Sequence, residues 1–453
     1  MRPSSPHILL VNPWIHDFAA YDSWAKPLGL LTLAAILTAS GFEISYVDCL
    51  NRFHPKAPET DPKSRYGRGP YLKQRIQKPK GLEDVPRRFS RYGIHPDWFR
   101  EDLFAVPPPD LILVTSRMTY QWPGVRETIG DLKKVFPKVP TVLGGVYATL
   151  CHDHAVANSG ADHIIPGHAE KQIFRLVTRL TGFLSGSGSA SAGFDPDNLD
   201  TYPYPALDLQ TNISYVPLLT SRGCPFSCAY CASSLINDAF LRASPDRVVE
   251  EIVYWHARYH VSDFILYDDA FLIDAPTHAQ PILEKVIRSK IKVRFHTPNA
   301  LHVREISKST AKLLFRAGFE TIRLGLETAE ADDHRHLDQK VTNREFMKAA
   351  AHLRDAGFTP DQVGAYLLVG LPGQHLSSVE NSAAFVIRCG IRPVWAYYTP
   401  IAGTRLWEQA VRSSRYPLAS DPIFTNNALF PCSREPFSWE RLSYLRSLTV
   451  RGP

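Results

Sequence analysis

The sequence predicts an α/β protein in which an amino-terminal parallel sheet is followed by a partial (β/α)6 TIM-type barrel. Two observations lead to this fold class. Short apolar runs alternate with helical stretches, a pattern that favours parallel sheets covered by helices on both faces. The alternation is interrupted at residues 182–193 by a run of Gly, Ser and Ala that cannot form a core. We therefore expect two domains along the 453 residues.

The first series of strands and helices lies within residues 1–181. Strands are expected at 7–11, 42–47, 111–114, 141–143 and 163–165, and helices near 28–40, 124–136 and 169–181. Between the second and third strands, residues 51–100 hold 13 Lys and Arg against 5 Asp and Glu, mixed with aromatic residues and without a helical or strand period. We interpret this segment as a basic insertion, which is either solvated or an arm that closes over an anionic substrate or cofactor tail.

A Gly, Ser and Pro-rich linker at residues 182–205 precedes the second series, at residues 206–410. Strands are expected to open near residues 215, 263, 292, 321, 362 and 392. Helix-end signals separate them, such as Ser244 before Pro245, and Gly318 and Gly357 as helix stops. Six strand–helix units in a row predict the partial barrel, whose functional residues should lie at the carboxyl ends of its strands. Residues 411–453 form a carboxyl-terminal extension.

Composition and charge limit the setting and the partners. The net charge of +6 is concentrated in the basic insertion, so we do not expect a nucleic-acid partner; only if the protein is a sensor without turnover would this insertion contact nucleic acid. The apolar run after the first residues is too short for a signal-peptide core, and no run approaches a membrane span. Seven cysteines, three of them clustered, do not fit a disulfide framework, which favours a cytoplasmic protein.

The most informative motif is the CxxxCxxC run of Cys224, Cys228 and Cys231, which supplies three thiolates and no local fourth. An iron–sulfur cube held by three thiolates keeps one iron open. Structural zinc usually takes four ligands, typically in two pairs, and a second cysteine pair is missing here. His256 and His260 could nominally complete a zinc site, but a histidine pair on a polar helix face is more often solvated. We therefore favour a [4Fe-4S] cluster.

This motif follows the first strand of the second series and places Tyr230 directly before its last cysteine, and it resembles the radical S-adenosylmethionine (radical SAM) superfamily. The resemblance implies that the open iron chelates the methionine end of S-adenosylmethionine (SAM), in contact with Tyr230. Reductive cleavage of SAM then yields a 5'-deoxyadenosyl radical.

Later strand ends supply the other SAM-binding residues that the resemblance implies. Asp268 or Asp269 takes the place of a family Gly-Gly-Glu that receives the amino group, in an Asp-Asp-x-Phe variant seen in members joined to cobalamin domains. Glu327 is expected at the ribose or amino-acid end, Gly370 beneath the adenine, and Asn299 at a further polar contact. Two plainer alternatives stay open: the paired aspartates cap the next helix, and Gly373, the second glycine of the Gly-Leu-Pro-Gly run, belongs to an ordinary tight turn.

The first domain resembles the flavodoxin/Rossmann-like cobalamin (B12)-binding domain. A Ser-Arg-Met follows one strand, a Gly-Gly pair follows the next, and Pro-Leu-Gly-Leu and Ile-Ile-Pro-Gly-His-Ala-Glu motifs are typical of radical enzymes that carry such a domain. The resemblance implies the following residues beside the nucleotide tail of the corrinoid: Ser116, Thr119, Gly144, Gly145, Tyr147 and Gly167.

One departure from the cobalamin-binding pattern concerns the cobalt ligand. The family Asp-x-His-x-x-Gly should fall after the first strand, where this chain has Trp14 at the histidine position. We expect a corrinoid with water or no protein nitrogen below the cobalt, with His16 as a possible substitute ligand.

Taken together, the resemblance implies a radical SAM enzyme with a [4Fe-4S] cluster, SAM and cobalamin, although it designates no catalytic residue. We expect it to abstract hydrogen from an unactivated carbon of a small-molecule substrate and then to transfer a methyl group from methylcobalamin. A low-potential donor of the flavodoxin or ferredoxin type would supply electrons. The alternatives are a cobalamin-assisted rearrangement or cyclisation without methylation, and a cobalamin- or cluster-binding sensor without turnover.

Overall fold

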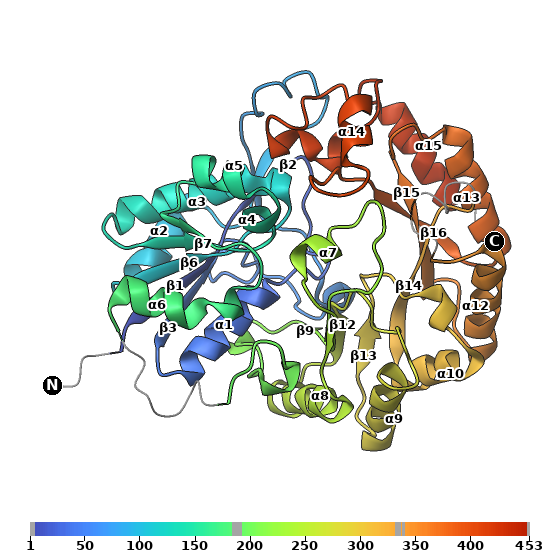
Figure 1. Ribbon diagram of the computed structural model, residues 1–453, viewed down its shortest axis with the longest axis horizontal. Helices are drawn as coiled ribbons and strands as arrows, with labels where there is room; N and C mark the ends of the chain where they lie inside the picture. Colours follow the sequence, from blue (N-terminus) through green and yellow to red (C-terminus); the bar gives the residue numbers. More distant parts are fainter. Residues whose placement is uncertain (1–4, 184–192, 331–336, 338–339, 451–453) are drawn as a thin grey trace. The chain divides into compact units, whose positions relative to one another are not determined.

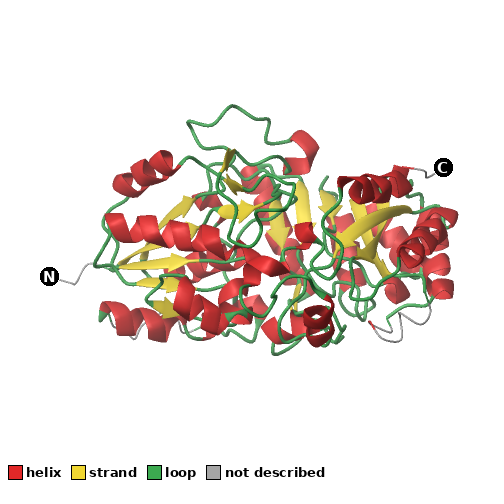
Figure 2. Cartoon of the chain, turned by 90° about the horizontal axis from the view of Figure 1, so that it is seen from above, coloured by secondary structure: helices red, strands yellow, loops and turns green. Residues whose placement is uncertain are grey.

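The computed structural model describes residues 5–183, 193–330, 337 and 340–450, and the chain divides into two compact units (Figure 1). Unit 1 comprises Met1–Ser214 and Ser420–Ile423, and unit 2 comprises Tyr215–Ala419 and Phe424–Pro453. Strands lie between helices in each unit (Figure 2), so the predicted α/β class with parallel sheets is confirmed. Within the expected linker, residues 184–192 lie outside the described residues.

Unit 1 is built on a five-stranded parallel sheet with the order β3-β1-β6-β7-β8. Its strands are β1 (His7–Asn12), β3 (Glu43–Asp48), β6 (Leu111–Val114), β7 (Thr141–Leu143) and β8 (His163–Ile164). Counted along the chain, this is the order 2-1-3-4-5 of flavodoxin-type sheets. Ligands bind such sheets at the carboxyl ends of the strands, near the point where the winding reverses.

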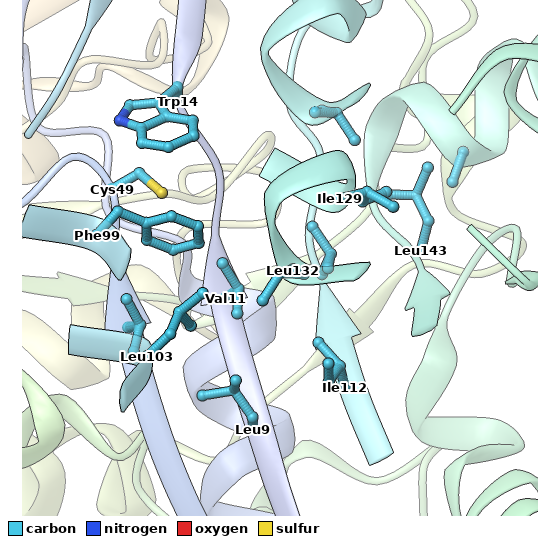
Figure 3. Close-up of a cluster of buried hydrophobic side chains, with 14 of the residues drawn as sticks. Leu9, Val11, Trp14, Cys49, Phe99, Leu103, Ile112, Ile129, Leu132 and Leu143 are labelled. Carbon is cyan, nitrogen blue, oxygen red and sulfur yellow. The ribbon is translucent and has the colours of Figure 1, made fainter. Parts of the chain in front are cut away.

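Both faces of this sheet are covered, which explains why β1 is a continuous apolar run. Leu9 and Val11 pack into one buried cluster (Figure 3), and Ile8 and Leu10 pack into another. Successive side chains of a strand point to opposite faces, so helices must cover both. The helices of unit 1 are α1 (Leu28–Ala39), α2 (Pro96–Ala105), α3 (Trp122–Val135), α4 (Val146–Leu150), α5 (His152–Asn158) and α6 (Ile173–Thr181).

The basic insertion is more regular than its sequence suggested, and that part of the interpretation was wrong. Its strands β4 (Lys73–Arg75) and β5 (Ser90–Tyr92) form an antiparallel sheet with β2 (Ile15–Asp17). Helix α2 begins at Pro96 and buries Phe99 fully against the core of unit 1. The apolar side chains of the segment are therefore packed, while its Lys and Arg side chains are mostly exposed.

Unit 2 is built on six parallel strands that lie in sequence order, as a partial (β/α)6 barrel requires (Figure 1). They are β9 (Val216–Leu218), β12 (Asp263–Leu266), β13 (Arg294–His296), β14 (Phe319–Glu327), β15 (Val363–Val369) and β16 (Arg392–Tyr397). A short antiparallel pair, β10 (Ser221–Arg222) and β11 (Leu241–Arg242), flanks the cysteine run.

The connecting helices begin and end at the predicted signals. Ser244 accepts a hydrogen bond from the Arg247 amide at the start of α8, and Gly318 and Gly357 end α10 and α12 in the left-handed conformation. The helices are α7 (Ser233–Ile236), α8 (Pro245–Tyr259), α9 (Ala279–Ser289), α10 (Lys308–Ala317), α12 (Asn343–Ala356), α13 (Leu376–Arg388), α14 (Trp407–Ser413) and α15 (Trp439–Val450).

The carboxyl-terminal extension packs against the last strand of the barrel. The indole of Trp395 on β16 donates a hydrogen bond to the Leu445 carbonyl on α15 (2.9 Å), and Phe430 joins a buried cluster with side chains of α13 and α15. This packing covers the edge strand of the sheet, which would otherwise present unpaired backbone groups. Among the helices that the structure describes, none has the length and apolar character of a membrane-crossing segment.

Candidate functional site

The three cysteines of the CxxxCxxC run line one cavity of about 250 Å³ in unit 2. The cavity opens at the carboxyl ends of the barrel strands, where a barrel places its reactive groups. Its other lining residues come from the cysteine loop, from the ends of β12, β13 and β14, from within β15 and from the segment that precedes α12. They include Tyr230, Asp269, Asn299, Glu327, Lys340 and Tyr366. Four of the predicted SAM-binding residues are thus brought together with the three cysteines.

The backbone of the cysteine loop is held by hydrogen bonds from distant segments. The Arg405 side chain donates to the Ser227 carbonyl (2.7 Å), and the Leu406 amide donates to the Ala229 carbonyl (3.1 Å). The Ala229 amide donates to the Leu337 carbonyl (2.7 Å). These contacts fix the loop without engaging any of the three sulfur atoms.

The donor set fits an iron–sulfur cube better than a single zinc ion. None of the three cysteines of the run forms a disulfide, and burial raises the pKa of Cys224 and of Cys231. Among the described residues, no group of three His, Cys, Asp or Glu side chains is arranged around one ion position. The nominal zinc ligand His256 instead hydrogen-bonds the Val261 carbonyl (2.9 Å) near the end of α8. Three thiols that share a cavity but not a single ion position match the requirement of a multinuclear cluster.

The paired aspartates after β12 face different surroundings. Asp269 lines the cavity and accepts a hydrogen bond from the Ser233 hydroxyl (2.6 Å). The backbone amide of Ser233 donates in turn to the Cys231 sulfur (3.4 Å). Asp268 is buried away from the cavity lining and accepts hydrogen bonds from the Thr220 and Ser221 hydroxyls (2.6 and 2.7 Å). The structure therefore separates the two candidates that the sequence left open.

Asp268 holds the segment that leads into the cysteine loop. The Thr220 hydroxyl also lies 2.9 Å from Nε2 of the buried His278. Burial raises the pKa of Asp268 to about 6, although its hydrogen bonds from Thr220 and Ser221 act in the opposite direction. Burial and the nearby Arg242 likewise lower the pKa of His278 to about 4. This network positions backbone, and it does not line the cavity.

Glu327 is the most strained of the predicted site residues. It ends β14 with φ +67°, in the left-handed region that residues other than glycine seldom adopt. The register between β14 and β15 shifts at this point, between Gly325 and Glu327. A side chain at Gly325 would meet the Glu327 carboxylate at 3.4 Å, so the bare glycine makes room for it. A bulge of this kind re-aims a side chain, here a largely buried carboxylate that lines the cavity.

Sequence reasoning missed Lys340, the cationic side chain among the residues that line this cavity. Its ammonium lies 6.0 Å from the ring centroids of both Phe226 and Tyr230. Burial alone would lower its pKa, but the charges of Cys228, Glu327 and Cys224 around it raise the pKa above the usual value. No local pattern marks this lysine, because it follows a stretch without helical or strand period.

Two further predicted residues take different positions. Asn299 lines the cavity, and its amide donates hydrogen bonds to the carbonyls of Tyr267 and Asp268 (2.9 and 3.2 Å). Gly370 ends β15 with φ +89° and does not line the cavity. A side chain at Gly370 would meet Phe430 of the extension at 3.4 Å.

Unit 1 carries a second cavity, of about 150 Å³, at the carboxyl ends of its strands. Leu30, Leu33, Leu113, Val142, Ile165 and Ile173 give it an apolar lining. Gly29, Gly144, Gly145 and Gly167 also line it, together with the polar residues Thr115, His168 and Glu170. The motifs around Gly29 and Gly167, far apart in sequence, therefore meet at one site. Such a cavity accepts a flat apolar group and lets a polar chain pass close to the backbone.

Three of the six expected cobalamin residues do not line this cavity, and each has another role. Ser116 is buried beneath the glycine pair, where its hydroxyl donates to the Gly144 carbonyl (2.6 Å). Tyr147 is fully buried in the core, and its hydroxyl lies 2.7 Å from Nδ1 of His154. Thr119 is buried in the turn before α3. Gly144, Gly145 and Gly167 are the members of the set that border the cavity.

Neither Trp14, which stands at the expected histidine position, nor the substitute candidate His16 lines this cavity. The Trp14 indole is 1% exposed, donates to the Ile94 carbonyl (2.8 Å) and packs edge-on against Phe99 at 4.8 Å (Figure 3). His16 lies 2.6 Å from the Glu127 carboxylate. Burial by itself would raise the pKa of Glu127, but hydrogen bonds from His16 and Arg91 have the larger combined effect and lower this pKa to about 2. This contact holds His16 beside Glu127.

Comparisons with known proteins agree with this arrangement. Residues 218–386 match the family described as Radical SAM superfamily. The chain is similar to the uncharacterized methyltransferase PH0819 of Pyrococcus horikoshii, with 23% identity over 330 residues that cover 68% of this chain and 70% of that protein. It is also 25% identical to an anaerobic magnesium-protoporphyrin IX monomethyl ester cyclase of Cereibacter sphaeroides, over 66% of this chain and 53% of the cyclase. The chain thus spans about half the length of this second relative.

Solved structures share the fold over most of the chain. The radical SAM methyltransferase TsrM of Kitasatospora setae, with tryptophan and a SAM analogue bound, has a TM-score of 0.66 at 16% identity, covering 91% of this chain and 78% of its own. Another TsrM structure holds cobalamin and a [4Fe-4S] cluster. OxsB, a cobalamin-dependent SAM radical enzyme with aqua-cobalamin bound, has a TM-score of 0.61 at 13% identity, covering 90% of this chain and 55% of its own.

Residues 218–386 therefore match a radical SAM domain, as the cysteine motif predicts, and the similarity of the chain to methyltransferases and cyclases supports an enzyme. A domain of this superfamily uses a [4Fe-4S] cluster and SAM. The predicted resemblance to cobalamin-dependent members is confirmed, and a sensor without turnover is not supported.

Proposed function

We propose that this enzyme is a cobalamin-dependent C-methyltransferase that acts on a small-molecule substrate. When bound, its cofactors would supply a 5'-deoxyadenosyl radical that abstracts hydrogen from an unactivated carbon, and a methyl group for that carbon. The observation that carries the proposal is the presence, in one chain, of a three-cysteine cavity and a glycine-lined apolar cavity. The methyltransferase names among the relatives support it.

In unit 2, the chain's own residues would bind and orient the cluster and SAM. The three cysteines would hold three irons of the cluster, and Asp269 would accept hydrogen bonds from the amino group of SAM. Glu327 would accept them from the ribose or the amino-acid end, since its strained backbone aims a buried carboxylate into the cavity. Lys340 would balance the negative charge that gathers around the thiolates.

In unit 1, the apolar cavity would hold the nucleotide tail of cobalamin. Gly144, Gly145 and Gly167 would let its backbone approach closely, and the leucines and isoleucines of the lining would pack against its base. The indole N–H of Trp14 donates to the Ile94 carbonyl in the core, and the His16 ring contacts Glu127. We therefore propose that neither residue supplies a nitrogen ligand to the cobalt.

We also propose a low-potential electron donor of the flavodoxin or ferredoxin type, and a cytoplasmic setting. Single-electron reduction of the cluster requires such a donor. The seven cysteines are all free thiols, as expected of a protein in a reducing compartment.

The test uses a partial reaction that needs no substrate. Anaerobically reconstituted enzyme with reduced cobalamin is mixed with SAM labelled at its methyl group. Formation of methylcobalamin and S-adenosylhomocysteine, together with dithionite-dependent release of 5'-deoxyadenosine, supports the proposal. Cys231→Ala should lose the cluster and the release of deoxyadenosine, whereas Cys389→Ala, at the end of α13 and outside the cavity, should retain both.

The alternative is a cobalamin-assisted rearrangement or cyclisation without net methylation, which the cyclase relative favours. It predicts release of 5'-deoxyadenosine with no label on cobalamin. That outcome would replace the methyltransferase proposal and leave the cofactor set intact.

A further inference from the structure

His302 is a half-buried histidine in unit 2 whose two ring nitrogens are buried. It lies on the loop after β13, lines the three-cysteine cavity and stacks on Phe226 of the cysteine loop, with ring centroids 5.1 Å apart and planes at 24°. Both ring nitrogens are buried, and neither has a hydrogen-bond partner among the described residues. Buried polar groups are nearly always partnered, so this exception requires a cause.

Other buried histidines of unit 2 do have partners. The His296 ring lies 3.0 Å from Asp263 and 3.1 Å from Thr321. His352 contacts the Ile306 carbonyl at 2.8 Å, and His278 contacts Thr220 at 2.9 Å. Unpartnered nitrogens are therefore a property of the one histidine in this group that borders the cavity.

The surroundings of His302 determine what it can bind. Burial and the charge of Lys340 lower its pKa to about 4, so the imidazole is neutral and offers one N–H donor. Lys340 lies over the ring of Phe226, the same ring on which His302 stacks. Asp269 and Glu327, which also line the cavity, are carboxylates. The cavity thus presents carboxylates for a cationic group and, at Phe226, an ammonium and an imidazole N–H for an anionic group.

We infer that the His302 imidazole donates a hydrogen bond to the carboxylate of the methionine end of SAM and so positions the cofactor against the cluster. The inference rests on the proposed function, because that proposal places SAM in this cavity. The amino-acid end of SAM matches this arrangement. Its amino group would donate a hydrogen bond to a carboxylate such as Asp269, and its carboxylate would face Lys340 and His302.

Two substitutions separate hydrogen bonding from packing. His302→Phe keeps a flat ring on Phe226 and removes the donor, whereas His302→Gln keeps a donor and removes the ring. The dissociation constant of SAM is measured by anaerobic equilibrium dialysis on reconstituted holoenzyme, with iron and sulfide content as a check on the cluster. We expect His302→Phe to weaken SAM binding by about 10- to 100-fold, as loss of a charge-assisted hydrogen bond does. His302→Gln should stay within about threefold of the wild type.

A SAM analogue without the carboxylate, decarboxylated SAM, identifies the group that His302 binds. We expect the dissociation constant of the analogue, divided by that of SAM, to be at least about tenfold larger for the wild type than for His302→Phe. The reason is that removing the carboxylate and removing the imidazole abolish the same contact. His302→Ala replaces His302→Phe if the latter retains no cluster. Equal preferences in wild type and variant, or equal weakening by Phe and Gln, would overturn the inference. A wild type that forms the cluster but binds no SAM would instead overturn the proposed function, and the inference with it.

Discussion

Replacement of Gly145 by alanine tests the backbone that borders the unit 1 cavity. Gly145 has φ +92°, and an added Cβ would lie 2.4 Å from the Ser116 carbonyl oxygen and 2.7 Å from its amide nitrogen. Both neighbours are backbone atoms, so no flexible side chain can move aside. Gly144 is its matched control, because a Cβ there would meet only the Ile165 carbonyl oxygen at 3.8 Å, an ordinary contact.

The expected destabilisation follows from these contacts. A positive φ costs a residue with a Cβ about 1–2 kcal/mol. Relief of the clash must separate Gly145 from Ser116 and weaken the hydrogen bonds from the Ser116 hydroxyl to the Gly144 carbonyl (2.6 Å) and from the Val146 amide to the Ser116 carbonyl (3.1 Å). Each such bond contributes about 1 kcal/mol. Gly145→Ala should therefore lower the free energy of unfolding of unit 1 by about 2–4 kcal/mol, and Gly144→Ala by less than about 1 kcal/mol.

The assay must report on unit 1 alone, because a chain of two units need not unfold in one step. Native-state hydrogen exchange of peptides from β6 and β7 in increasing urea meets this need. Cobalamin retention on a desalting column, read by absorbance, is measured in parallel. Both variants should retain less cobalamin, since both glycines border the cavity, but only Gly145→Ala should lose exchange protection. Unchanged protection in Gly145→Ala would refute the steric argument.

Three further substitutions probe unit 2. Glu327→Gln keeps the volume but removes the charge, and it should weaken SAM binding by about 10- to 100-fold in equilibrium dialysis, as loss of a charge-assisted hydrogen bond does; unchanged affinity would exclude contact. The pKa of Asp268 is raised to about 6 in the folded state, so the protonated form stabilises the fold below about pH 4 and this stabilisation is lost as the pH rises through 6. The free energy of unfolding should fall by about 3 kcal/mol across this range. Urea titrations should find this decline in the wild type and not in Asp268→Asn. Arg405→Ala should speed cluster loss to a chelator with little change in stability, because Arg405 is exposed but holds the Ser227 carbonyl.

Local patterns predicted the framework of both units because their causes are local. Gly318 and Gly357 end helices where a residue without a Cβ adopts a left-handed conformation, and Ser244 caps α8 through its own side chain. The signal for α2 was also present, since Pro96 occupies its first turn and His95 caps it. The many Lys and Arg residues of this segment obscure that helix-start signal in the sequence.

The missed site residues have tertiary causes. Lys340, His302 and Arg405 follow no motif, and their meeting at the cysteine loop depends on how strand ends converge in a barrel. Tyr147 shows what a resemblance leaves open. The resemblance implied a residue beside cobalamin, but α4 begins at Val146 and directs Tyr147 into the core. Sequence spacing fixes neighbours along the chain, and it does not fix the direction of a side chain on a helix.

Backbone conformation connects the two cavities through one physical rule. Gly145 and Glu327 both follow or end a parallel strand, both have positive φ, and both border a cavity. A glycine adopts this conformation at no steric cost, so at Gly145 the absence of a side chain is the feature that the cavity uses. At Glu327 the same sign of φ costs about 1–3 kcal/mol in strain, and the side chain that it directs is a largely buried carboxylate that lines the cavity. We therefore expect cobalamin to be bound through backbone at Gly145 in unit 1, and SAM through a side chain at Glu327 in unit 2. Gly145→Ala tests the first expectation, and Glu327→Gln tests the second.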